Sequence, residues 1–385
     1  MLVVKSVKQS CHSTELYELM KEFRFMVNEA IRTGIEKHIT SKLRLRNELY
    51  PRFKNEFHTS YISMAVFKAH ALLKAYRKIL KKNPNAKQPY VWKDFLIVDS
   101  KHHKIFYDHV RIPTRPRKFV MISLNRYTLN ILSAPNLKIG NAVINPYTLC
   151  IYFSKEIGMQ KPTGFVGIDM NLENATIVDD SGKTTIFDMS RIVASKMKYR
   201  EVLSHFKRND ARIQKKLKQK YGRKQKNREE TFLHQKSKET VFKGKQIFME
   251  NLTGINRLYR KGNGQGTRFR FRLNSWTRFK LQNMINYKSM WYNGFPVIYL
   301  NPKGTSSKCS ICETKLLEEN RMIRCLQCGL YIDRDVNAAR NILARGMKFV
   351  PDAVQSEAMK QSKDVEPIAP SLSTQSDKTR ELQFI

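Results

Sequence analysis

Four cysteines near the C-terminal end constrain the fold of this chain more than any other feature. They stand as two CxxC pairs, in KCSICETK and in IRCLQCGL. Each pair turns two thiolates toward one point, and two pairs complete the tetrahedral set of four sulfurs that Zn²⁺ prefers. Four unrelated thiols are the alternative, but the paired spacing favours metal. We therefore predict a structural zinc ribbon whose ligands are Cys309, Cys312, Cys325 and Cys328.

The charge balance predicts a polyanionic partner. The 385 residues include 71 Lys and Arg but 33 Asp and Glu, so the formal net charge is +38. Such an excess fits nucleic acid or an anionic membrane surface. No apolar run approaches the roughly 18–20 residues of a membrane span, and the basic residues do not gather in one amphipathic stripe. We expect nucleic acid and no membrane.

The two remaining cysteines, Cys11 and Cys150, have no spacing that suggests a disulfide framework. Free thiols beside a zinc ribbon are typical of a reducing cytosol. We therefore expect a cytoplasmic protein.

The N-terminal half combines β-like and helical segments. LVVKSVKQS resembles a strand, and helical spacing of apolar residues follows over about 14–35 and 64–80. Short β-like runs then occupy about 90–157, separated by Pro, Asn and Gly. This pattern predicts a small barrel that the first strand closes, with the helices inserted into it.

The second half predicts a different unit. Three strands (GFVGIDM, ATIVD and TTIFD) are followed by a long basic helical stretch, a strand QIFMEN, a helix, a strand PVIYLN, the ribbon and a final helix DVNAARNILARG. This is the element order of the RNase H-like fold. An α+β multidomain protein is the fold class that we expect.

Three acids stand at the ends of predicted elements in this second unit. Asp169 ends the first strand, Glu250 ends the fourth, and DRD opens the last helix. Two-metal phosphodiester cleavage needs such converging carboxylates to hold Mg²⁺. Taken singly, each acid has an ordinary explanation, since turns and first helical turns favour acids. Together they predict a catalytic site.

Several of these motifs resemble the successive RuvC-domain motifs of the TnpB family. The similar segments are GFVGIDM, IFMENLTGI, RLNSWTRFKLQNMINYK, PVIYLNPKGTSSKCSICE and RCLQCGLYIDRDVNAARNIL. TnpB proteins are transposon-encoded, RNA-guided DNA endonucleases related to miniature type V CRISPR effectors. The resemblance implies a catalytic, magnesium-binding triad of Asp169, Glu250 and Asp335, with Asp333 as the helix cap. The first motif departs from the family by continuing as MNLEN, which we expect not to touch the metal-binding acids.

The resemblance also implies a domain organisation and a set of partners. The partners would be a guide RNA and double-stranded target DNA, in the prokaryotic cytoplasm or nucleoid, with a monomer favoured. The expected domains are a wedge-like β-barrel (1–9 and 86–158), a helical recognition insert (10–85), a RuvC nuclease (159–302 and 331–348), a zinc ribbon (303–330) and a disordered tail (349–385).

Two basic segments leave alternatives open. The stretch from Lys198 to Arg228 is either a solvated charged face or a surface that tracks phosphates. RFRFRLNSWTRF interleaves Arg with aromatics, either for stacking on bases or as core aromatics of a helix capped at Asn274 or Ser275. Arg321 and Arg324 are candidates for contact with the cleaved strand.

Three other functions remain open from the sequence. A nuclease-inactive, RNA-guided repressor would use the same scaffold, but all three acids are present. A miniature type V CRISPR effector would share the motifs. A plain zinc-ribbon nucleic-acid-binding protein would lack a guide RNA.

Overall fold

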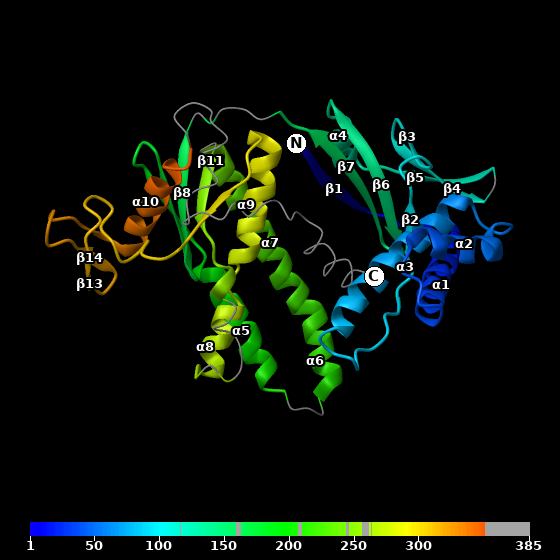
Figure 1. The fold of residues 1–385 in the computed structure, drawn as a ribbon, viewed down its shortest axis with the longest axis horizontal. Coiled ribbons are helices and arrows are strands. Elements are labelled where there is room, and N and C mark those ends of the chain that lie inside the picture. Colours follow the sequence, from blue (N-terminus) through cyan, green and yellow to red (C-terminus); the bar gives the residue numbers. More distant parts are fainter. Residues whose placement is uncertain are drawn as a thin grey trace. The chain divides into compact units, whose positions relative to one another are not determined.

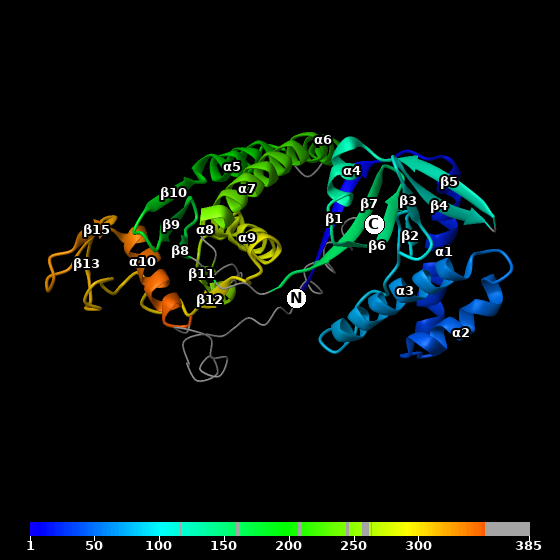
Figure 2. The same cartoon turned by 90° about the horizontal axis from the view of Figure 1, so that it is seen from above.

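The computed structural model describes residues 1–350, apart from 116, 159–161, 163, 207–209, 244–245, 256–261 and 263. The chain divides into two compact units at the boundary between Ile157 and Gly158. Figures 1 and 2 show the elements of each unit in two views. Of the predicted tail, residues 351–385 lie outside the described part. Phe349 and Val350 pack against the core of the second unit, so that core extends past the predicted start of the tail.

Two sheets build the N-terminal unit. The first has the strand order β1-β7-β6-β2, and the second has the order β3-β4-β5. The first strand does join the later ones, because β1 pairs antiparallel with β7 along its whole length. The bounds are β1 (Leu2–Ser10), β2 (Leu96–Val98), β3 (Lys104–Phe106), β4 (His109–Arg115), β5 (Lys118–Ser123), β6 (Leu137–Asn145) and β7 (Thr148–Glu156).

A buried glutamine links the two sheets. Gln9, near the end of β1, donates from Nε2 to the carbonyl of Ser123 at 2.7 Å and accepts from the backbone N–H of Asn125 at 3.1 Å. Both polar ends of this amide are thereby satisfied inside the unit. Gln9 thus joins two separate sheets, and the closed barrel stays a prediction.

Three helices stand between β1 and β2, at the place that the sequence predicted for the insert. They are α1 (Glu15–Glu36), α2 (Lys42–Phe53) and α3 (Thr59–Leu80), and a short α4 (Arg126–Leu132) follows β5. The predicted helices over 14–35 and 64–80 are confirmed, although α3 begins five residues earlier. Its first turn is capped by His58, whose ring accepts from the N–H of Ser60. The sequence analysis missed α2.

A five-stranded sheet forms the centre of the second unit. Its order is β10-β9-β8-β11-β12; β8, β9 and β10 are antiparallel, whereas β11 and β12 run parallel to β8. The predicted order of strands and helices is confirmed. The strands are β8 (Phe165–Met170), β9 (Asn174–Asp179), β10 (Thr184–Asp188), β11 (Gln246–Glu250) and β12 (Ile298–Leu300).

Helices cover both faces of this sheet. One face packs against residues of α7 and α9, and the other packs against α10, as Figure 1 shows. The helical bounds are α5 (Ser190–Ser204), α6 (Ala211–Leu217), α7 (Arg223–Lys243), α8 (Thr267–Asn274), α9 (Arg278–Asn293) and α10 (Arg334–Met347), with a π-helical turn η2 (Lys218–Gly222) joining α6 to α7. None of the helices within the described residues has the length and apolar character that a membrane crossing requires.

One cap prediction was wrong. RFRFRLN forms the separate helix α8, and the next helix begins at Arg278 instead of after Asn274 or Ser275. Thr277 takes the cap position but makes no side-chain cap hydrogen bond. Ser275 instead bonds back to the carbonyl of Phe271, so its hydroxyl ends one helix and does not start the next.

Candidate active site and metal centre

The alternation of strand residues brings Asp169 and Glu250 to one face of the sheet. In β8, Val166, Ile168 and Met170 enter the core beneath α7 and α9, so Gly167 and Asp169 face α10. In β11 the same rule turns Phe248 toward α10, and Glu250 lies two residues further along that face. The strands pair in parallel with Met249 opposite Ile168. Both acids therefore lie near the C-terminal ends of neighbouring parallel strands, at the same end of the sheet.

Two glycines let the acid-bearing helix α10 lie close to this face. A Cβ atom at Gly167 would stand 2.4 Å from the carbonyl oxygen of Ala339, and one at Gly346 would stand 2.1 Å from Phe248. Neither position has room for a larger side chain. The close contact brings the first turn of α10, with Asp335, to the strand end that carries Asp169.

Burial raises the pKa values of both strand acids, and the charges of neighbouring acids add to the effect at Asp169. Asp169 is 7% exposed, and desolvation, followed by the charges of Glu250 and Asp335, raises its pKa to about 7. Desolvation also raises the pKa of Glu250, opposed by a hydrogen bond from Thr305 and by the charge of Arg345. The Thr305 hydroxyl donates to Glu250 Oε1 at 2.5 Å. Both Glu250 and Asp335 therefore lie near enough to Asp169 for their charges to raise its pKa.

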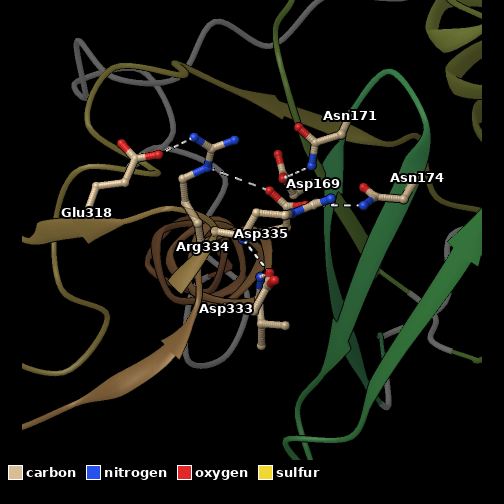
Figure 3. A network of polar contacts seen from close by, with 9 residues as sticks. Asp169, Asn171, Asn174, Glu318, Asp333, Arg334 and Asp335 are labelled. Atoms are coloured by element: carbon tan, nitrogen blue, oxygen red, sulfur yellow. Dashed lines mark hydrogen bonds and ion pairs between the residues drawn. The ribbon is translucent and has the colours of Figure 1, made fainter. Parts of the chain in front are cut away.

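Asp333 and Asp335 have separate tasks at the start of α10. The predicted cap is confirmed: Asp333 accepts from the backbone N–H groups of Asp335 at 2.8 Å and Val336 at 3.3 Å. The Asp335 side chain is buried and points away from the cap, toward Asp169 (Figure 3). It pairs with Arg321, whose Nη2 lies 2.5 Å from Oδ2. Arg321 comes from the turn between β13 (Leu317–Glu319) and β14 (Met322–Arg324) of the ribbon, whereas Arg324 is exposed on β14.

Two asparagines of the MNLEN segment contact the acids. Asn171 donates to Asp169 Oδ2 at 2.8 Å, and Asn174 donates to Asp335 Oδ2 at 3.2 Å (Figure 3). The expectation that this segment does not touch the acids was therefore wrong. The strand β8 ends at Met170, one residue after Asp169, and β9 begins at Asn174, so Asn171 in the turn and Asn174 at the start of β9 both lie close to this strand end. The sequence spacing carried this signal, because Asn171 lies only two residues past the acid.

The donor set of this site fits a hard divalent cation. Oxygen is the donor that Mg²⁺ selects, so the three buried carboxylates would be its ligands. Among the described residues, the buried Oδ1 of Asn174 has no hydrogen-bond partner, although its Nδ2 is engaged. Such an oxygen is suited to accept from a metal-bound water. Among the described residues, only the four cysteines, described next, bring their ligand atoms close enough together to hold an ion as they stand.

The four cysteines form the second candidate metal centre. Their sulfurs all lie within 4.8 Å of one another, with 3.5 Å between Cys309 and Cys328 and 3.4 Å between Cys312 and Cys325. Zn–S bonds of about 2.3 Å in a tetrahedron separate sulfurs by roughly 3.8 Å. The cluster therefore fits Zn²⁺. The thiols lie around a small three-stranded sheet of β13 (Leu317–Glu319), β14 (Met322–Arg324) and β15 (Tyr331–Asp333), so the ribbon extends past the predicted end at residue 330.

Two asparagines of α10 hold the base of the ribbon. Asn337 accepts from the N–H of Ser310 at 3.0 Å and donates to the carbonyl of Lys308 at 2.8 Å. Asn341 donates to the carbonyls of Lys308 and Thr305, both at 2.8 Å. Sequence reasoning missed these roles, and their spacing of four residues on one helix is the signal that could have indicated them.

Comparisons with family models match both units of the chain. Residues 279–342 match the Cas12f1-like TNB domain, and residues 19–113 match a family described as the uncharacterized protein MJ0013 family. The first match spans the ribbon and most of α10. The second lies wholly in the N-terminal unit.

Individual relatives extend these matches. The CRISPR-associated endodeoxyribonuclease Cas12f1 of Sulfoacidibacillus thermotolerans is 38% identical over 100 residues, which are 25% of this chain and 21% of that protein. The solved structure of a Cas12f1–sgRNA–target DNA complex superposes with a TM-score of 0.54 at 15% identity, covering 86% of this chain and 83% of that one. This likeness shows a shared fold.

A more extensive sequence match comes from Methanocaldococcus jannaschii. Its TnpB-like protein MJ0751 is 34% identical over 256 residues, which are 62% of this chain and 91% of that protein. An identity of this size over nearly the whole of a relative agrees with the motifs around Asp169, Glu250 and Asp335. The chain belongs to the TnpB family.

Proposed function

We propose that this protein is an RNA-guided, Mg²⁺-dependent DNA endonuclease that cuts beside a short adjacent motif with a single RuvC-type site. The proposal is supported by relatives that are named as nucleases, among them a CRISPR-associated endodeoxyribonuclease. The observation that supports it most is that β8, β11 and α10 bring Asp169, Glu250 and Asp335 to the same end of the sheet, where the charges of Glu250 and Asp335 help to raise the pKa of Asp169.

The three carboxylates would hold the cations and Asn174 would orient a water. Bound Mg²⁺ ions would supply an activated water and stabilise the leaving oxygen of the phosphodiester. Asn171 keeps one oxygen of Asp169 engaged and leaves the other oxygen free of that bond. Thr305 holds Glu250 in the same way. Arg321, paired with Asp335, would exchange this partner for a phosphate of the cleaved strand.

The N-terminal unit would bind the guide RNA and its target. We propose that the β1–β7 strands form the wedge-like part and that α1, α2 and α3 form the recognition insert. Their role would be to hold the heteroduplex through its backbone, because base pairing with the guide supplies sequence specificity. The zinc ribbon would be the structural part of the target-binding region, held by its four cysteines.

The experiment begins with RNA that co-purifies with the protein. Sequencing that RNA identifies the guide, and a DNA duplex complementary to it provides the substrate. The wild type should cut this DNA with Mg²⁺ or Mn²⁺. Asp169→Ala, Glu250→Ala and Asp335→Ala should each abolish cleavage and leave RNA and target binding nearly intact, since a two-metal site fails when one acid is removed.

Asp333→Ala is the matched control, because it removes an acid of the same helix turn that only caps α10. It should retain most cleavage. If the wild type binds RNA and target but never cuts, the repressor function replaces this proposal. If no specific RNA co-purifies, the protein is an unguided nucleic-acid-binding protein.

A further inference from the structure

The segment between α3 and β2, light blue in Figure 1, contains two exposed aromatic residues, Tyr90 and Trp92. Trp92 is 76% exposed and Tyr90 is 53% exposed, whereas Val91 between them is only 6% exposed and therefore buried. The two rings touch each other, with centroids 4.6 Å apart and planes inclined by 62°. Other aromatic side chains of this unit are as exposed, among them Tyr107 and Tyr127, so it is the contact between the two rings, not their exposure alone, that distinguishes this pair.

The backbone under this pair is held in place by α1. Asn28 donates to the carbonyl of Val91 at 3.0 Å and accepts from its N–H at 2.9 Å, as a neighbouring strand would. Arg24, one turn earlier on the same helix, donates to the carbonyl of Trp92 at 3.0 Å and forms an ion pair with Asp94. The segment therefore presents its two rings from a fixed backbone. Pre-organisation of this kind reduces the entropy lost when a ligand binds.

The charges of the neighbouring sequence indicate what kind of ligand would bind here. From Phe57 to Lys93 the sequence contains no acidic residue, and its basic side chains include Lys74, Lys78, Lys81, Lys82, Lys87 and Lys93, all exposed. A partner that combines negative charge with flat apolar faces matches this stretch. Single-stranded nucleic acid has both properties, because its bases stack on aromatic rings while its phosphates pair with lysines.

We propose that Tyr90 and Trp92 form a stacking platform for an unpaired base of RNA. The choice of RNA rests on the proposed function. Folded RNA leaves loop nucleotides with splayed bases that aromatic side chains take up, whereas duplex DNA keeps its bases stacked inside. Lys87 and Lys93, on either side of the pair, would bind the adjoining phosphates.

The test uses a 12-nucleotide single-stranded RNA with the full chain, and compares it with single-stranded DNA and duplex RNA of the same sequence. Tryptophan emission should be quenched by the single-stranded RNA, and the quenching should be lost in Trp92→Phe. Trp92→Ala should weaken binding by about 5- to 150-fold, the range measured for one stacked base. The slope of log K against log salt should not change, because no phosphate contact is removed.

Two further variants separate stacking from folding. Tyr127→Ala removes an aromatic of the same unit that is 67% exposed, and it should leave RNA affinity unchanged. Asn28→Ala keeps both rings but frees their backbone, so affinity should fall less than in Trp92→Ala while the emission of Trp92 becomes less polarised. Unchanged affinity in Trp92→Ala overturns the proposal, as does quenching by DNA alone. The proposal is also overturned if Trp92→Ala changes the sedimentation of the protein but not its RNA affinity. That result would assign the aromatic pair to self-association.

These results are independent of cleavage. If the platform variants bind RNA normally while the triad variants lose cleavage, only the stacking proposal fails. If the wild type quenches with RNA but never cuts DNA, only the endonuclease proposal fails.

Discussion

Replacing Asp169 by asparagine should stabilise the protein at alkaline pH in the absence of added Mg²⁺. Burial and two neighbouring acids raise the pKa of Asp169 from 3.8 to about 7. Each pKa unit corresponds to about 1.36 kcal/mol, so ionised Asp169 destabilises the fold by at most about 4 kcal/mol. Relaxation and water entry reduce this figure, and we expect about 2 kcal/mol. The amide introduced by Asp169→Asn would keep an oxygen to accept the hydrogen bond from Asn171.

The sign of the pH dependence follows from proton binding. Between about pH 4 and pH 7 the native state holds a proton on Asp169 that the unfolded chain has lost, so the free energy of unfolding decreases as pH rises through this window. Asp169→Asn removes that decrease. The variant should therefore match the wild type near pH 4 and exceed it at pH 8, by roughly 4–8 °C in Tm for a unit of this size.

Thermal unfolding is measured from pH 4 to pH 8 without chelator, and the metal content is measured at each pH, because protonation of the cysteines would release zinc. Asp188→Asn is the control of opposite sign, because a hydrogen bond with Ser190 lowers the pKa of exposed Asp188. Its carboxylate stabilises the fold at neutral pH, and this contribution is lost as pH falls. Equal pH dependence of wild type and Asp169→Asn, or a destabilised variant at pH 8, would refute the reasoning.

The remaining predictions concern metal, salt, capping and packing. Cys325→Ser should release zinc, measured by metal analysis, and loosen only the ribbon. Asp333→Ala should lower the free energy of unfolding by about 0.5–2 kcal/mol in denaturant titration. Gly167→Ala should destabilise by about 1–3 kcal/mol or more, since its Cβ meets a backbone oxygen, whereas Gly254→Ala meets nothing and should be neutral. RNA affinity should depend less steeply on salt when three lysines at the junction of α6 and η2 become Gln: Lys215, Lys216 and Lys218. An unchanged slope would mean that these lysines form only a solvated face.

Local sequence patterns predicted much of the second unit. The short apolar runs in GFVGIDM and QIFME predicted both strands, and these strands, which carry Asp169 and Glu250 near their ends, are neighbours in the sheet. The CxxC spacing predicted the sulfur cluster. These features depend on residues close in sequence, whose geometry the strand and the turn largely determine.

Contacts between distant segments could not be predicted in this way. Thr305 reaches Glu250 across 55 residues, and Asn174 reaches Asp335 across 161. The pairing of Arg321 with Asp335 depends on where the ribbon stands on α10. The helix α2 was missed because Pro51 stands inside it, and proline ordinarily argues against a helix interior.

The attachment of the ribbon to α10 makes it an exchangeable module. One end is held by Asn337 and Asn341, and the other end runs through β15 directly into the helix. Strand lengths between these two ends can therefore vary without altering the sheet that carries Asp169 and Glu250. Arg321 stands on the part that would vary. A ribbon of different length would thus change which basic side chain stands beside Asp335. Engineering of this loop would then alter the charge around the site without replacing an acid.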